Sequence, residues 1–215
     1  IFTIFIDHVP GNTLDRLTYK NFGFSDAAEV FVLISGISVA LAYEAKFVTG
    51  NRLKQTLKLW RRASVLYVAH IVITVATIAI FCLGAVLAKR PDLLTQINLE
   101  AVFNRTPETF IGMITLGHQL GYNNILPLYA AIMLASPLVL LTARHGPLVT
   151  LAVSGAAWLT AGLWQIVPRN YPEAGFWFMN PLSWQFLFFI GLVGATYVRR
   201  GGVIAVKGWA IALAA

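Results

Sequence analysis

Apolar segments of about 20 residues, the length that crosses the hydrocarbon core of a bilayer as a helix, recur along this chain. Short charged loops separate them. Composition agrees, because 58% of the residues are hydrophobic, 12% are charged and the mean hydropathy is +0.71. Soluble domains carry charge on about a quarter of their residues. The 215 residues therefore predict an all-α, polytopic transmembrane bundle of about six to seven spans.

The apolar runs set the expected order of the helices. The first run is short, and longer candidates follow at 27–47, 63–87, 124–142, 148–167 and 183–198, with the beginning of a seventh after Gly202. Residues 106–120 are too short and interrupted for a span, and they predict an interfacial helix or re-entrant piece. No internal repeat or low-complexity linker stands out, so we expect a single membrane domain, residues 1–215. Because the chain begins and ends inside apolar runs, we expect this domain to be truncated at both ends.

The charges in the loops predict an orientation. Loops after the second, fourth and sixth segments carry Lys and Arg and no acid, whereas the intervening loops hold the acidic loop residues. By the positive-inside rule, the first set is cytoplasmic and the second set faces outward. The formal net charge of +7 is then explained by topology and by contact with anionic lipid, so we expect no nucleic-acid partner.

Four ionisable side chains gather where the first apolar run ends and the second begins. Asp7 and His8 close the first run, and Asp26 and Glu29 open the second. Asp26 and Glu29 have the spacing of a capping box, with Asp26 as the N-cap. Ionisable groups beside the bilayer of an otherwise apolar chain indicate a functional site, although Asp7-His8 can also be read as a polar helix end.

A second set of polar side chains belongs to the third segment. Arg61 and Arg62 stand at its expected cytoplasmic end, and His70 lies about 12 Å deeper at 1.5 Å per residue. An imidazole at that depth is costly unless it faces the bundle interior. Tyr67 precedes His70 by one turn on the same face. Two alternatives remain open. The arginines can be explained by membrane topology alone, because cytoplasmic helix ends carry positive charge. His70 can instead make a hydrogen bond that packs two helices together.

Several separated motifs resemble those of OpgC-type proteins, which are bacterial inner-membrane proteins related to acyltransferase family 3. The motifs are Phe5-Ile6-Asp7-His8-Val9-Pro10, Asn21-Phe22-Gly23-Phe24-Ser25-Asp26-Ala27-Ala28-Glu29, Arg61-Arg62-Ala63 with Leu66-Tyr67 and His70, Leu126-Pro127-Leu128-Tyr129, and Asn180-Pro181-Leu182-Ser183-Trp184-Gln185. The resemblance runs from the first residue to about Gly191. It implies a parent protein of about ten spans.

The resemblance implies an O-acyltransferase, by analogy a succinyltransferase. Such an enzyme moves an acyl group from a cytoplasmic coenzyme A thioester to a hydroxyl of a periplasmic glucan. His8 would be the catalytic base on the periplasmic side, and Asp7 or Asp26 would hold its imidazole and stabilise the cation. Arg61 and Arg62 would bind the phosphates of coenzyme A through their planar guanidinium groups.

The remaining candidates contact the acyl group or the acceptor. Tyr67 and His70 would line the acyl path. Acceptor-binding candidates are Asn21, Glu29 and Trp184, with Asn123, Asn124, Arg105, Glu108, His118 and Gln119 as further possibilities. Glu29 can instead serve only as a capping-box residue. Trp184 can instead belong to an aromatic belt at the outer interface, together with Tyr171, Phe176, Trp177 and Phe178.

The expected partners are the lipid bilayer, an acyl-CoA donor (by analogy succinyl-CoA) and a periplasmic glucan or another surface carbohydrate. We expect no permanently bound cofactor. We also expect no metal site, because the histidines at 8, 70, 118 and 145 lack ligand spacing. A transporter or flippase of a glycan or lipid intermediate is the main alternative, although no internal repeat is evident. A non-catalytic membrane scaffold would have no need of His8 and His70.

Overall fold

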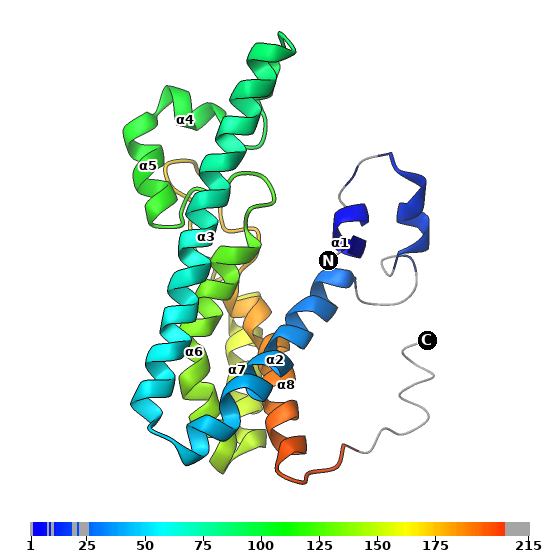
Figure 1. Ribbon diagram of the computed structural model, residues 1–215, viewed down its shortest axis with the longest axis vertical. Coiled ribbons are helices and arrows are strands. Elements are labelled where there is room, and N and C mark those ends of the chain that lie inside the picture. Colours follow the sequence, from blue (N-terminus) through cyan, green and yellow to red (C-terminus); the bar gives the residue numbers. More distant parts are fainter. Residues whose placement is uncertain (1, 8, 10, 19–20, 22–25, 205–215) are drawn as a thin grey trace. The chain divides into compact units, whose positions relative to one another are not determined.

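The computed structural model describes residues 2–7, 9, 11–18, 21 and 26–204 (Figure 1). Within this part of the chain, the regular structure is helical apart from one isolated bridge between Arg169 and Phe176. The predicted all-α class is therefore confirmed. The elements in order are α1 (Phe2–Asp7), η1 (Thr13–Leu17), α2 (Ala27–Thr49), α3 (Arg52–Leu87), η3 (Pro91–Thr95), α4 (Glu100–Asn104), α5 (Thr106–Ile114), α6 (Ile125–His145), α7 (Pro147–Leu163) and α8 (Pro181–Arg199).

Four helices, α2, α3, α6 and α8, are long and apolar enough to cross a membrane. This count is lower than the predicted six to seven for identifiable reasons. The first run forms only six helical residues, α7 is apolar but has 17 residues, and most of the seventh run lies outside the described residues. The expectation that 106–120 does not span is confirmed, since α5 has nine residues.

The basic segment before the third span is helical, which corrects its prediction as a loop. Gly50 ends α2 and its N–H donates to Lys46 O at 3.0 Å, but α3 begins at Arg52 rather than near Ala63. Lys, Arg, Leu and Gln are all good helix formers, so the helix starts before its apolar part does. Its 36 residues extend about 54 Å.

The capping box of α2 is present as predicted. Asp26 Oδ1 accepts from the N–H groups of Ala28 and Glu29 at 2.7 and 3.2 Å, and Glu29 Oε2 accepts from Asp26 N–H at 2.5 Å. These bonds satisfy backbone donors that the first helical turn leaves unpaired. They fix the beginning of α2.

The chain forms two compact units. The first comprises residues 1–52, 138–155 and 185–215, and the second comprises residues 53–137 and 156–184. Helices α6, α7 and α8 contribute residues to both. The single membrane domain expected for 1–215 stays a prediction.

In the first unit, α2 and α8 approach each other through glycine. A Cβ on Gly36 would lie within 3.0 Å of the backbone at Phe188 and Leu192, and a Cβ on Gly191 would press on the backbone at Leu33. Small residues allow such close approach between membrane helices. Between α7 and α8, Ser154 Oγ donates to Gln185 Oε1 at 2.5 Å.

In the second unit, α4 and α5 lie beside the C-terminal half of α3 (Figure 1). The core between them contains Leu99, Val102, Met113 and Leu120, with Ile78 and Phe81 of α3 packed against it. Toward the other end of α3, Trp60 Nε1 donates to Leu134 O of α6 at 3.2 Å. The face of α3 that carries Val68, Val72 and Val75 is exposed, as a lipid-facing surface requires.

Candidate functional site

The first predicted cluster belongs to the first unit, and its central member, His8, lies outside the described residues. Asp7 ends α1, which contacts α2. Among the described residues, Asp7 Oδ1 is buried and has no hydrogen-bond partner. Asp26 and Glu29 are both engaged in the capping box, and Asn21 lies on an exposed turn whose backbone N–H donates to Thr18 O at 3.1 Å.

The second predicted cluster lies on α3 in the second unit. Arg61 and Arg62 are exposed. Tyr67 donates its hydroxyl to Ile114 O of α5 at 2.8 Å. His70 is 0% exposed, and neither of its ring nitrogens makes a hydrogen bond among the described residues.

Polarity continues along the same buried face of α3. Thr74, one turn beyond His70, is 1% exposed and its hydroxyl has no partner among the described residues. Thr77 accepts a hydrogen bond from Asn123 Nδ2 at 2.9 Å, and the backbone of Asn123 also lies beside His70. His70 is buried, as an imidazole in an apolar helix requires, and its role and that of Tyr67 on an acyl path stay predictions. Unpaired polar groups inside an apolar helix are uncommon and suggest a functional role.

Trp184, in the first turn of α8, is half-buried, and its backbone N–H donates to Asn180 O at 3.0 Å. Asn180 also ties this turn to the preceding loop, because its Nδ2 donates to Ile166 O at 2.8 Å. Trp184 does not line the cavity described next, and its role in acceptor binding stays a prediction.

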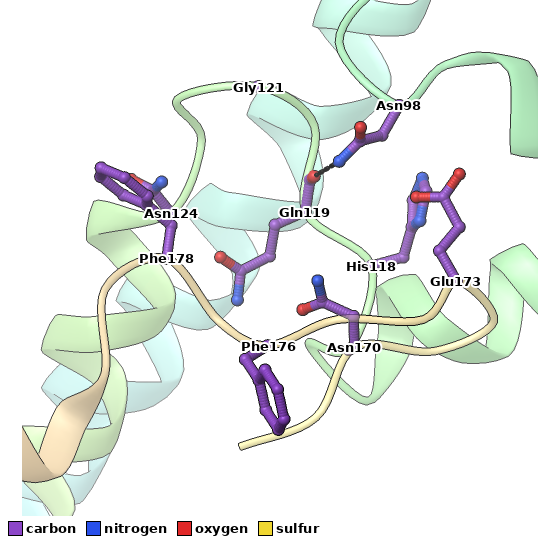
Figure 2. A pocket seen from close by; sticks show the side chains of 10 residues that line it. Asn98, His118, Gln119, Gly121, Asn124, Asn170, Glu173, Phe176 and Phe178 are labelled. Atoms are coloured by element: carbon purple, nitrogen blue, oxygen red, sulfur yellow. Dashed lines mark hydrogen bonds between the residues drawn. The ribbon is translucent and has the colours of Figure 1, made fainter. Parts of the chain in front are cut away.

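A polar cavity of about 140 Å³ lies in the second unit, among loops outside the membrane-length helices (Figure 2). Its lining combines amides, one imidazole, one carboxylate and two phenyl rings: Asn98, Gly117, His118, Gln119, Gly121, Asn124, Asn170, Glu173, Phe176 and Phe178. Of the residues proposed to contact glucan, Asn124, His118 and Gln119 line it. Arg105 and Glu108 do not.

The walls of the cavity are held by backbone hydrogen bonds, one between the two loops and one within the 168–178 loop. Tyr171 N–H donates to Gly117 O at 3.0 Å, and Asn170 N–H donates to Gly175 O at 2.9 Å. Gly112 permits this contact, because a Cβ there would meet the carbonyl group of Tyr171. Arg105 supports the loop from outside the cavity by donating to Pro172 O at 3.3 Å.

His118 is the buried titratable group of the cavity. It is 2% exposed, and its Nε2 has no hydrogen-bond partner among the described residues. Burial lowers the pKa of His118 below its ordinary value, while the Glu173 carboxylate and the Asn98 backbone oppose that shift. The imidazole is therefore neutral near pH 7, and it can accept or donate a hydrogen bond.

Sequence reasoning missed Asn98, Asn170 and Glu173 and assigned Phe176 and Phe178 to an aromatic belt. These side chains come from two segments that are far apart in the sequence. The dense aromatic and polar composition of the 168–178 loop was the available signal, but it did not reveal the partner segment. Among the described residues, no group of three His, Cys, Asp or Glu side chains could hold a metal ion.

Comparison with known protein families shows which family this chain belongs to. The family model described as OpgC protein matches residues 1–215. The chain belongs to the OpgC protein family. Membership indicates a glucan-modifying membrane protein, and it extends the resemblance beyond Gly191 to the last residue. No curated protein and no solved structure gives a significant match to this OpgC family member.

Proposed function

We propose that this OpgC family member is an O-acyltransferase that transfers an acyl group, in the simplest case succinyl, from a coenzyme A thioester to a hydroxyl of a periplasmic glucan. The match of the OpgC family over residues 1–215 carries this proposal. The four membrane-length helices support a location in the bacterial inner membrane, where a cytoplasmic donor and a periplasmic acceptor face opposite sides.

In the proposed reaction, an acceptor hydroxyl oxygen attacks the thioester carbonyl carbon. A new C–O ester bond forms, the C–S bond breaks, and the coenzyme A thiolate leaves. His8 accepts the hydroxyl proton during the attack and returns it to the leaving sulfur. This general-base role suits an imidazole, because its ordinary pKa lies close to neutrality.

Asp7 is the better of the two proposed partners for His8. Asp26 Oδ1 already accepts two backbone hydrogen bonds in the capping box, whereas Asp7 Oδ1 is buried without a partner among the described residues. A buried carboxylate oxygen favours a hydrogen-bond donor nearby. We therefore assign Asp7 to orienting the base and Asp26 to fixing the start of α2.

The donor side of the proposal rests on α3. The guanidinium groups of Arg61 and Arg62 are exposed and so are available to phosphate oxygens. Tyr67 and His70 follow on the same helix, and the buried ring nitrogens of His70, which make no hydrogen bond among the described residues, support their assignment to the acyl path. No permanently bound cofactor is needed for this chemistry.

The test is the mass and charge of periplasmic glucans from cells that express the wild-type protein, a His8→Ala variant or neither. His145→Ala is a matched control, because His145 is exposed at the end of α6. We expect acidic acyl groups on the glucans with the wild type and His145→Ala, and a loss of at least about 100-fold with His8→Ala. Identical glucans in all cells, with equal amounts of protein in the membrane, would contradict the proposal and favour a transporter or flippase.

A further inference from the structure

We infer that the cavity lined by Asn98, His118, Gln119, Asn124, Asn170 and Glu173 binds one sugar ring of a neutral glucan. We call it the amide pocket. Naming this sugar as part of the acyl acceptor rests on the proposed function, whereas the binding of a sugar does not.

The size of the amide pocket suits one ring. Its volume is about 140 Å³, below the range of about 300–1,000 Å³ for sites that enclose drug-sized ligands. A coenzyme A molecule is far too large for this space. A single pyranose ring of a longer chain fits the scale, with its neighbours extending into solvent.

The chemistry of the lining favours neutral hydroxyl groups. Each Asn or Gln amide offers both donors and an acceptor, and a sugar hydroxyl needs both from its neighbours. Figure 2 shows the side-chain amides of Gln119 and Asn170 facing the same space, and Asn98 Nδ2 donates to the backbone carbonyl oxygen of Gln119 at 3.5 Å. These groups supply several directions for hydrogen bonding within one small volume.

The charge of the lining argues against ions. Among the described residues, no Lys or Arg lines the amide pocket, so a phosphate or carboxylate ligand would meet the Glu173 carboxylate without a compensating cation from them. Calcium takes six to eight oxygen ligands, several of them commonly carboxylate oxygens, and Glu173 is the one carboxylate that the described part of the chain contributes to the lining. A neutral polyol is the ligand class that fits.

A further observation points to a sugar. Phe176 and Phe178 line the amide pocket but are 55% and 79% exposed, so their rings border it where it meets solvent. An aromatic face packs against the C–H face of a sugar ring. His118 also lines the pocket, and its buried Nε2 has no partner among the described residues.

The amide pocket also lies next to the polar face of α3. Asn124 lines the pocket, and the preceding residue, Asn123, has its backbone beside His70 and its side chain on Thr77. A ring held here would therefore be close to the buried polar residues of α3. The proposed sugar site and the proposed acyl-path residues therefore belong to the same unit.

The experiment uses the purified full-length protein in detergent or lipid nanodiscs. Titration calorimetry measures the Kd of a neutral gluco-oligosaccharide, with an oligosaccharide of uronic acids as the acidic probe. A transfer assay measures the KM for glucan and for succinyl-CoA separately. The variants are Gln119→Ala, Asn170→Ala and Phe178→Ala, with Phe178→Trp as the conservative replacement and Asn104→Ala as the control.

Asn104 is an exposed amide of α4 that bonds only to Glu100 in the described contacts and lies outside the amide pocket. Phe178 is so exposed that its removal leaves folding intact. We expect each pocket variant to raise the glucan Kd and KM about threefold to tenfold, the loss of one hydrogen bond or ring contact. The KM for succinyl-CoA should not change, Phe178→Trp should retain binding, and the acidic probe should bind more weakly.

The Kd for glucan could be unchanged in all three pocket variants while the wild type transfers acyl groups. This result would refute the assignment of the amide pocket as a sugar site and would leave the proposed function standing. Binding that weakens in the variants of a protein that transfers no acyl group would uphold the sugar site and refute the proposed function. Tighter binding of the acidic probe, or displacement of the sugar by CaCl₂, would overturn the assignment to a neutral sugar.

Discussion

Replacement of Gly36 by Ala tests whether the glycine contact between α2 and α8 holds the first unit together. The new Cβ would lie 2.9 Å from Phe188 C and 3.0 Å from Leu192 N, and closer still to the Phe188 carbonyl oxygen. Attractive carbon contacts occur at about 3.5–4.0 Å. Because the opposing atoms are helix backbone, no side chain can rotate away, and the two helices must separate locally by about 1 Å.

A gap of this size forfeits about a quarter to a half of the dispersion energy of each affected contact. Overpacking of a tight core typically costs about 1–3 kcal/mol, and we expect Gly36→Ala at the upper end of that range. For a protein of 150–250 residues, each kcal/mol lowers the Tm by about 2–4 °C, so the expected fall is about 6–12 °C. The measurement is thermal unfolding in a fixed detergent, followed by tryptophan fluorescence.

Gly162→Ala is the matched control. Gly162 lies within α7, and a Cβ there would meet nothing within 4 Å, so alanine should raise helix stability by about 0.5–1 kcal/mol. Gly191→Ala acts at the same contact, and the double variant with Gly36→Ala should fall short of the sum of the single effects. A Tm for Gly36→Ala equal to that of the wild type would refute the reasoning.

Two further predictions concern charge. Glu44 is 8% exposed and lies 3.8 Å from both Arg199 and Arg200, so Glu44→Gln should destabilise the protein by about 1–2 kcal/mol after allowance for the partly exposed arginines. Asp92→Asn should lower the Tm much less than Glu44→Gln does, because the Asp92–Arg90 pair is exposed, although its contact is shorter at 2.6 Å. A larger fall in Tm for Asp92→Asn than for Glu44→Gln would contradict this prediction. The pKa of His118 is lowered in the folded protein, so folding favours the neutral imidazole. Its contribution to the free energy of unfolding is fully present above the ordinary histidine pKa of about 6.5, and it is lost as the pH falls through the lower pKa of the folded state. Thermal unfolding between pH 8 and 5 should therefore show a smaller acid loss for His118→Gln than for the wild type, and equal losses would exclude His118 as the source.

Local chemistry made part of the fold predictable. The N-terminus of α2 followed from the Asp26 and Glu29 spacing, since a capping box needs only residues three apart. The inward orientation of His70 followed from the cost of an imidazole in lipid. Each of these two features depends on a single helix and on whether water or lipid surrounds it, so residue spacing and hydropathy were sufficient to predict them.

Helix boundaries were less predictable where apolar and helical segments differ. Hydropathy located the lipid-facing part of α3 and therefore missed its basic first turns from Arg52. In α7, the predicted span continued to Val167, but the helix ends at Leu163 and Gln165 has a positive φ of 50°. Hydropathy measures compatibility with lipid, whereas backbone conformation also decides where a helix ends.

The amide pocket shows why the site was harder to predict than the fold. Asn98 and Asn170 are 72 positions apart in the numbering, and outer-loop asparagines are also ordinary turn residues. What brings their segments together is a backbone contact, Tyr171 N–H to Gly117 O, made possible by the missing side chain of Gly112. No residue in that contact has a functional side-chain signature, so a single sequence carries little sign of it.

Within the second unit, α3 carries the residues proposed to bind the donor and borders the proposed sugar site. On α3, the exposed Arg61 and Arg62 precede the buried His70 by two to three turns, and Asn123 connects that face to the edge of the amide pocket. Polar groups would not be kept in an apolar helix for packing alone, because leucine at such a position avoids the desolvation cost. Their alignment between exposed cations and a neutral polar pocket supports the proposal that α3 carries donor-binding residues and borders an acceptor sugar site.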